Sequence, residues 1–274
     1  MTSGQAQRAE RFLELHRRGA PLLLPNPWDV GSARLLASLG FEALATTSSG
    51  FAATLGRLDG AVDRDEALAH AAEIVAATTL PVSADLEDGF GAAPAEVAET
   101  VSLAREAGLA GCSIEDYGGR GERTIYDRGL ATERVAAAAE AAHAGSTRLV
   151  LTARAENHVR GLDDLADTVA RLQAFQEAGA DVLFAPGLTT MEQIRAVVDS
   201  VDRPVNVLMR PGVPSVSELA AIGVSRVSVG GGFAFAALGA VVEAARELRE
   251  QGTCGYWEHL ALGAQAARAA FGAT

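Results

Sequence analysis

Lysine is missing from this sequence, and all 23 of its cationic residues are Arg. Arginine does not form a Schiff base with a carbonyl group at accessible pH. The absence therefore excludes aldolases that use a lysine imine and enzymes that hold pyridoxal phosphate on a lysine. The 35 acidic residues outnumber the cations and leave a net charge of −12. Such a charge repels phosphate backbones and anionic membrane surfaces, so we expect no nucleic-acid partner.

Cysteines and long apolar runs are also scarce. The two cysteines, Cys112 and Cys254, form no CxxC pair, which argues against a disulfide framework. The longest uncharged stretch, residues 227–242, is shorter than the roughly 18–20 residues of a membrane span and contains a Gly-Gly-Gly run. The N-terminal residues MTSGQAQRAERF lack the apolar segment of a secretion signal. We expect a cytoplasmic protein that does not enter membranes.

Short apolar runs alternate along the chain with Ala-rich segments of helical period. Five apolar residues at helical spacing mark one such helix: Leu162, Leu165, Val169, Leu172 and Phe175. Eight runs have strand character: LLL at 22, ALATTSS at 43, PVSADLE at 81, AGCSIED at 110, LVLTARAE at 149, ADVLFAPG at 180, PVNVLMR at 204 and SRVSVGG at 225. This α/β pattern predicts one domain over residues 1–274, a (β/α)8 TIM-type barrel. An open, doubly wound sheet is the alternative.

Two helical segments, residues 233–250 and 256–271, follow the last predicted strand. The second is one more than barrel closure requires. It carries Tyr256, Trp257, Leu260, Leu262 and Phe271, which would leave apolar surface exposed on a lone monomer. We predict that 256–271 is a C-terminal interaction helix that packs on a neighbouring subunit of a homo-oligomer.

Polar residues gather where the predicted strands end, and barrel enzymes build their active sites at that end of the sheet. The candidates are Asn26, Trp28, Asp29, Ser48, Ser49, Gly50, Asp85, Glu87, Asp88, Glu115, Asp116, Arg154, Glu156, Asn206 and Arg210. Acidic side chains from neighbouring strands repel one another unless a cation lies between them, and carboxylate oxygens suit Mg²⁺ or Mn²⁺. Asp85, Glu87 and Glu115 form such a set. The alternative is that they are solvated or paired with arginines.

Arg154 ends an apolar strand, where a buried guanidinium needs an anionic partner. That partner is either a site acid or the carboxylate of a substrate, which Arg154 would hold with two hydrogen bonds. The small segment Ser48–Gly50 is predicted to be a turn whose backbone amides could receive a carboxylate.

Seven segments together resemble the isocitrate lyase and phosphoenolpyruvate mutase superfamily. They are NPWDVGSA at 26, TTSSGFAATLGRLDG at 46, ADLEDGFG at 84, GCSIEDY at 111, TARAE at 152, GADVLFAPG at 179 and VSELAAIGVSRVSVGGG at 216. The resemblance implies a (β/α)8 barrel that binds Mg²⁺ and forms a homotetramer, with its last helix swapped between subunits.

The resemblance also implies roles for particular residues. Asp85 matches the direct metal ligand, while Asp59, Glu87 and Glu115 match residues that hold metal-bound waters. Glu87 stands where many relatives have Asp. We further expect Asp59 and Glu115 to act in catalysis.

A second group of residues matches the part of the family site that binds substrate. The amides of Ser49, Gly50 and Phe51 would clasp a substrate carboxylate, and Arg154 would grip the same end and act in catalysis. Asn206, at the end of the seventh predicted strand, is a further candidate for binding substrate.

One segment departs from the family pattern. Isocitrate lyases and methylisocitrate lyases carry a Lys-x-Cys-Gly-His loop after the fourth strand, and phosphonate-processing relatives carry Lys and Asn there. This chain has EDYGGRGERTIYDRG at 115–129, with no Cys, His, Lys or Asn. Glu122, Tyr126, Asp127 and the arginines are the groups left for proton transfer, and the loop is expected to close over the site. Cys112 is predicted to be a buried core thiol.

These observations predict an Mg²⁺-dependent carbon–carbon lyase, with Mn²⁺ as an alternative metal. Its substrate is expected to be a small 2-oxo or 2-hydroxy (di)carboxylate that reacts by C–C cleavage or decarboxylation through a metal-bound enolate. Phosphorus–carbon chemistry, as in phosphonomutases and phosphonopyruvate hydrolases, is one alternative. A barrel that binds 2-oxo acids without turning them over is the other.

Overall fold

The computed structural model describes residues 3–118 and 124–272, and within them eight parallel strands form one sheet in the order β1-β10-β9-β8-β7-β4-β3-β2. The strands are β1 Leu22–Leu24, β2 Leu44–Ala45, β3 Val82–Asp85, β4 Gly111–Glu115, β7 Val150–Arg154, β8 Val182–Phe184, β9 Val205–Leu208 and β10 Arg226–Ser228. The two edges of the sheet meet, because Ala45 N–H donates to Pro25 O at 3.1 Å just after β1. The sheet is a nearly closed barrel, which confirms the predicted TIM-type fold, and each predicted run contains its strand.

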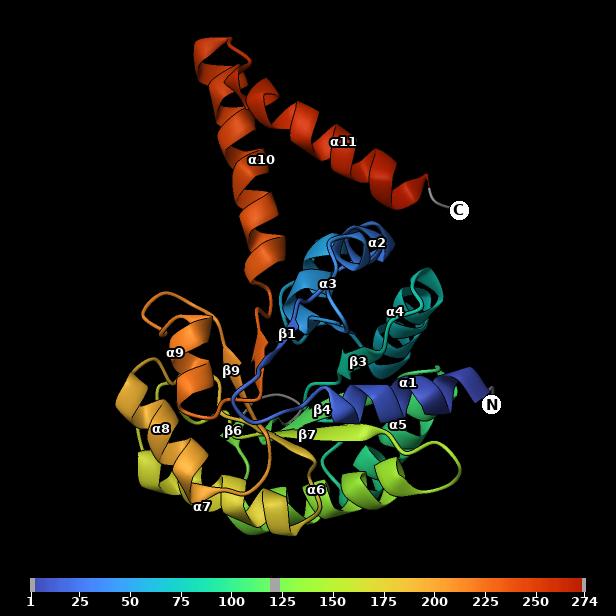
Figure 1. Ribbon diagram of the computed structural model, residues 1–274, viewed down its shortest axis with the longest axis vertical. Coiled ribbons are helices and arrows are strands. Elements are labelled where there is room, and N and C mark those ends of the chain that lie inside the picture. Colours follow the sequence, from blue (N-terminus) through green and yellow to red (C-terminus); the bar gives the residue numbers. More distant parts are fainter. Residues whose placement is uncertain (1–2, 119–123, 273–274) are drawn as a thin grey trace.

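Helices surround this barrel (Figure 1). They are α1 Ser3–Glu14, α2 Val30–Ser38, α3 Ser48–Thr54, α4 Arg64–Ala77, α5 Pro94–Glu106, α6 Arg128–His143, α7 Leu165–Glu177, α8 Met191–Ser200 and α9 Val216–Ala221. Their inner faces and the strands share one apolar core, which includes fully buried Ile74, Val97, Leu172 and Phe175. In the described part of the chain, no helix is both long and apolar enough to cross a membrane.

Two predictions within the barrel are wrong about where a helix begins. Leu162 was predicted to be helical, but it is 54% exposed and lies before α7, which Asp164 caps by accepting from Asp167 N–H. Ser48–Gly50 is not a turn but the start of α3, which Thr47 caps. In both cases a polar side chain satisfies the free amides of the first helical turn and so fixes where the helix begins.

Helix α1 closes the amino-terminal end of the barrel. Phe12 of α1 and Leu15, which directly follows the helix, form a second apolar cluster with the early residues of the strands, including Val150 and Val182. The barrel is thus sealed at one end by apolar side chains. Any cavity inside it opens toward the carboxyl ends of the strands.

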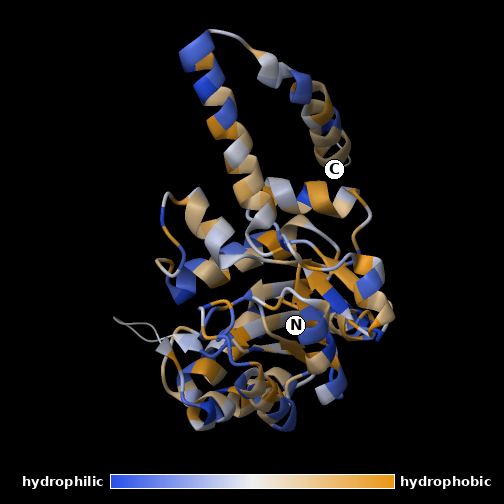
Figure 2. Cartoon of the chain, turned by 90° about the vertical axis from the view of Figure 1, so that its left-hand side faces the viewer, coloured by the Kyte–Doolittle hydropathy of each residue, from blue (hydrophilic) through white to orange (hydrophobic). Residues whose placement is uncertain are grey.

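The chain ends in an arm that leaves the barrel. Helix α10, Gly232–Gln251, projects away from the strands, and after the 3₁₀ helix Gly255–His259, helix α11, Leu260–Phe271, returns to pack on α2 (Figure 1). The predicted second helix is therefore α-helical only from Leu260. Apolar residues are interspersed along both helices (Figure 2). The largest exposed side chains of the arm include Phe233, Phe235, Val241, Trp257 and Leu262, from 41% to 71% exposed.

Candidate active site

A cavity of about 260 Å³ opens at the carboxyl ends of the barrel strands. Its upper wall carries Ser48, Ser49, Asp59, Asp85, Arg154 and Arg160, and its deeper part carries Ser83, Ser113, Asn206, Arg226 and Ser228. These side chains are polar or charged, while Leu24, Val159, Phe184 and Leu208 are among the apolar residues that line the rest of the cavity. The cavity therefore suits a small ligand that combines several oxygen atoms with a short carbon chain.

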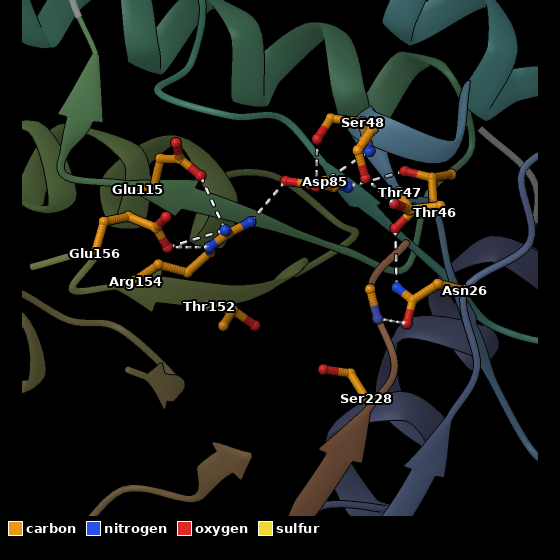
Figure 3. Close-up of polar contacts among 12 residues, drawn as sticks. Asn26, Thr46, Thr47, Ser48, Asp85, Glu115, Thr152, Arg154, Glu156 and Ser228 are labelled. Carbon is orange, nitrogen blue, oxygen red and sulfur yellow. Dashed lines mark hydrogen bonds and ion pairs between the residues drawn. The ribbon is translucent and has the colours of Figure 1, made fainter. Parts of the chain in front are cut away.

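Arg154, the last residue of β7, is surrounded by three carboxylates (Figure 3). Its Nη1 lies 2.9 Å from Asp85 Oδ1, and its Nη2 lies 3.1 Å from Glu115 Oε2 and 2.9 Å from Glu156 Oε1. Its Nε also donates to Glu156 Oε1, at 3.0 Å. These acids end β3 and β4 or follow β7, so neighbouring strands deliver them to one guanidinium. The sequence left two partners possible for Arg154, a site acid or a substrate carboxylate. The three acids contact Arg154, but its side chain also lines the cavity, so the structure is compatible with both partners.

Burial and charge shift the titration of this cluster. Burial raises the pKa of Glu115 well above its ordinary value, and the nearby carboxylates of Glu156 and Asp85 add to the rise. Arg154 and Arg160 oppose it. Burial alone would lower the pKa of Arg154, but its three carboxylate neighbours outweigh burial and raise it. Arg154 therefore stays cationic, while burial favours the protonated form of Glu115.

Asp85 is held by two residues that follow β2 as well as by Arg154. Ser48 donates to Asp85 Oδ2 from its amide at 3.2 Å and from its hydroxyl at 3.0 Å. The Thr46 hydroxyl accepts from the Asp85 amide at 2.9 Å. Asp59 lines the same cavity from an exposed position before α4.

The backbone of Glu87 and its neighbour Phe90 has an unusual conformation. The φ of Glu87 is 47° and that of Phe90 is 59°, both in the left-handed region that residues with side chains rarely adopt. Arg134 of α6 stabilises the loop by donating to the carbonyls of Asp88 and Gly91. The Glu115 amide donates to Glu87 O at 2.9 Å. Glu87 is thus buried beside the end of β4, although it does not line the cavity.

The predicted carboxylate clasp at Ser49–Phe51 is altered by the start of α3. The Phe51 amide donates to Thr47 O at 3.0 Å, and the Gly50 amide donates to Thr47 Oγ1 at 3.4 Å. Among the described residues, the Ser49 amide has no such hydrogen-bond acceptor. A ligand carboxylate would meet that amide first, since the other two are engaged within the helix.

The loop that departs from the family pattern contains a short hairpin. Strands β5, Tyr117–Gly118, and β6, Thr124–Ile125, pair antiparallel. The Tyr126 hydroxyl donates to Asp88 Oδ2 at 3.0 Å, and Asp127 caps α6, so neither lines the cavity. Residues 119–123 of the predicted closing loop 117–128, Glu122 among them, lie outside the described residues.

The deep part of the cavity contains residues that sequence reasoning undervalued. Asn206 lines the cavity, but it is the second residue of β9 rather than the end of that strand, and it donates to Ser228 Oγ at 2.9 Å. Arg226 was not foreseen, although a charged residue inside the apolar run SRVSVGG was a signal for it. Cys112 is fully buried, and burial raises its pKa to about 12, which agrees with a core thiol.

Carboxylate, hydroxyl, amide and guanidinium groups therefore meet around one cavity. Within residues 3–118 and 124–272, three or more acidic, His or Cys side chains do not converge on one point as a preformed metal site would require. The arrangement can bind a small carboxylate ligand and offers oxygen ligands to a cation.

Comparison with known proteins assigns this chain to a family. The family profile of phosphoenolpyruvate phosphomutase matches residues 12–249. The chain belongs to the phosphoenolpyruvate phosphomutase family. It is therefore a member of the isocitrate lyase and phosphoenolpyruvate mutase superfamily, as the sequence motifs predicted. Lyase and mutase chemistry is the function of this superfamily.

The chain is also similar to individual proteins of known structure or curated function. A crystal structure of a protein from Burkholderia cenocepacia J2315 has a TM-score of 0.90 and 54% identity, covering 94% of this chain and 93% of that one. Oxaloacetate decarboxylase of Paraburkholderia xenovorans is 34% identical over 77% of this chain and 71% of its own length. The 2-methylisocitrate lyase of Halalkalibacterium halodurans is 30% identical, over 73% and 67% respectively.

Proposed function

We propose that this phosphomutase-family chain is an Mg²⁺-dependent carbon–carbon lyase acting on a small 2-oxo or 2-hydroxy dicarboxylate. C–C cleavage and decarboxylation are the two forms of that reaction. The observation that carries the proposal is the pairing of Arg154 and Asp85 on the wall of a small cavity that other charged and hydroxyl side chains also line. The similarity to an oxaloacetate decarboxylase and a 2-methylisocitrate lyase supports this class of substrate.

The donor set fits a hard divalent cation that keeps most of its water. Asp85 and Asp59 supply carboxylate oxygens at the cavity, and Mg²⁺ commonly binds through one or two carboxylates and several waters. Such an ion needs no cluster of three direct protein ligands. Asp85 would be the direct ligand, with Asp59, Glu87 and Glu115 binding its waters. When bound, Mg²⁺ or Mn²⁺ stabilises negative charge that develops on the 2-oxo oxygen.

The chain's own residues would bind and orient the substrate. Arg154 would hold the carboxylate next to the 2-oxo carbon, and the Ser49 amide would donate to the same group. Glu115 would carry a proton for the reacting carbon, since burial favours its protonated form. Asn206 would contact the part of the substrate that enters the barrel.

We also propose a homotetramer in which the C-terminal arm packs on a neighbouring subunit. The exposed apolar side chains of α10 and α11 support this arrangement, because a monomer would leave them in water. Swapping of the arm between subunits is the specific form of tetramer that we propose.

We propose the cytoplasm as the location of the protein. Cys112 and Cys254 are both free, which fits a reducing compartment.

Product analysis tests the proposed reaction. The purified chain with Mg²⁺ is incubated separately with oxaloacetate, 2-methylisocitrate, isocitrate and phosphonopyruvate, and products are followed by NMR. The proposal predicts pyruvate from oxaloacetate, or cleavage of a 2-hydroxy diacid, above a blank that contains metal alone. Turnover of phosphonopyruvate alone would instead assign phosphorus–carbon chemistry. Ligand binding without turnover of any compound would indicate a binding protein.

A further inference from the structure

A second guanidinium lies deeper in the same cavity. Arg226 extends from β10 into the barrel and is 4% exposed, yet it lines the cavity that Arg154 also lines. Its Nε donates to Asn206 Oδ1 at 3.0 Å, and its Nη2 donates to Thr152 Oγ1 at 3.1 Å. Its Nη1 lies 3.2 Å from His16 Nε2. Arg226 thus forms the floor of the cavity above the apolar plug of α1.

The partners of Arg226 are all neutral. His16 Nδ1 lies 2.7 Å from Phe12 O, which can only accept, so Nδ1 carries the proton and Nε2 accepts from Arg226. Burial, aided by Arg226, lowers the pKa of His16 to about 3. Burial also lowers the pKa of Arg226 itself, to about 9, which leaves it cationic at neutral pH. Within the described chain, Arg226 has no carboxylate partner at ion-pair distance.

The two arginines of the cavity therefore differ in kind. Arg154 is in contact with three carboxylates, whereas Arg226 carries a buried charge that no acid balances. A guanidinium has five N–H donors, and three of those of Arg226 are used by the bonds described above. A buried, uncompensated charge is costly, and an anion that binds beside it removes much of that cost.

The surroundings of Arg226 leave room for such an anion. The cavity floor is lined by the short side chains of Ser83, Ser113 and Ser228, which add hydroxyl donors. Thr152, which contacts Arg226, lies two residues before Arg154 on the same strand and deeper in the barrel (Figure 3). Ser113 is the register partner of Thr152 on the neighbouring strand β4. Arg154 and Arg226 line one cavity of about 260 Å³, and the charge of Arg154 contributes to the lowered pKa of Arg226, so one small diacid in that cavity can reach both guanidiniums.

We propose that the cavity floor around Arg226 is an anion subsite that binds the second carboxylate of the substrate and so selects dicarboxylates over monocarboxylates. The proposal rests on the proposed function, in which Arg154 holds the first carboxylate. It adds Arg226, Ser113 and Ser228 as residues that determine specificity.

Binding measurements with two matched four-carbon ligands test the subsite. In 3,3-difluorooxaloacetate the fourth carbon is a carboxylate, whereas in 2-oxobutyrate it is a methyl group. Calorimetry with Mg²⁺ present gives the ratio of the two dissociation constants for the wild type and for Arg226→Met. We expect the wild type to prefer the diacid and Arg226→Met to reduce that preference about 10-fold or more, the scale of a lost charged hydrogen bond.

Two further variants separate recognition from folding. Ser113→Val fills the floor while keeping the charge, and it should reduce the same preference even if Arg226→Met fails to fold. Arg154→Gln should weaken both ligands, because both share the first carboxylate.

The outcomes distinguish the two proposals. The decisive variant is Arg226→Met if it folds, and Ser113→Val if it does not. If that variant keeps the wild-type ratio of the two dissociation constants, whether or not both affinities fall, the subsite is refuted while the proposed function stands. If the wild type binds neither 2-oxo acid, the proposed function fails and the subsite fails with it.

Discussion

Removing the charge of Arg154 should destabilise the fold as well as the site. Its side chain is 15% exposed, and its neighbours Glu115 and Glu156 are 4% and 1% exposed. Breaking a buried ion pair by removing one partner typically costs about 3–5 kcal/mol, because the remaining charge is left without compensation. Arg160 relieves part of the loss, since it lies 3.3 Å from Glu156 and 3.7 Å from Glu115. We therefore expect Arg154→Met to lose about 3 kcal/mol at pH 8, the lower end of that range.

The loss of unfolding free energy in Arg154→Met should be smaller at acidic pH. Burial already raises the pKa of Glu115, and removal of Arg154 raises it further, so the folded variant binds a proton more tightly than the unfolded chain. The variant therefore loses stability as the pH rises from about 4.5 through the raised pKa of Glu115. Protonation below that value removes one of the unpaired charges.

Urea unfolding followed by circular dichroism at pH 5 and pH 8, at one protein concentration, measures this effect. Arg249→Met is the matched control, because that side chain is 78% exposed and pairs only with Glu250 within the described residues. It should change the free energy of unfolding little at either pH. A loss below about 1 kcal/mol for Arg154→Met at pH 8, the usual size for an exposed pair, would refute the reasoning. An equal loss at both pH values would refute the role given to Glu115.

Three further predictions concern the arm, the loop and the core thiol. A chain ending at Gly252 should lose the tetramer, and light scattering that still shows a soluble tetramer would exclude the arm as its interface. Cleavage of isocitrate should be about 10²-fold or more slower than decarboxylation of oxaloacetate, because the loop lacks the family's acid/base Cys; a faster isocitrate rate in steady-state assays would contradict this. Thiol labelling of the folded protein at pH 8 should modify Cys254 and spare Cys112, whose pKa is about 12. Mass spectrometry after digestion locates the label.

The barrel could be predicted because its signals are local. Each strand is a short apolar run, and each run is separated from the next by a helical segment, so position along the chain suffices to place the polar residues that end the strands. Asp85, Glu115 and Arg154 could be placed at the same end of the barrel on that basis alone. The motifs then identified the superfamily.

The contacts among those residues could not be read in this way. The bond from Arg154 to Asp85 joins residues 69 positions apart, and the contact of Arg226 with His16 joins residues 210 positions apart. Such pairs follow from how strands and helices pack, which no local pattern reports. The left-handed φ of Glu87 was equally hidden, because a residue with a side chain gives no signal for it. The start of α3 was missed because SSG is as typical of a turn as of a capped helix.

Metal dependence of oxaloacetate turnover tests the central claim most directly. The initial rate is measured, after subtraction of a blank with metal alone, for the wild type with Mg²⁺, with EDTA, and with Mg²⁺ restored. Asp85→Asn is measured beside Asp199→Asn, a control whose side chain is 63% exposed. The account predicts that EDTA abolishes turnover, that Mg²⁺ restores it, and that Asp199→Asn retains it. In Asp85→Asn the rate should fall about 10²-fold or more, the scale seen when a group that stabilises developing charge is lost. Turnover that survives EDTA, or that Asp85→Asn leaves at the wild-type rate, would contradict it.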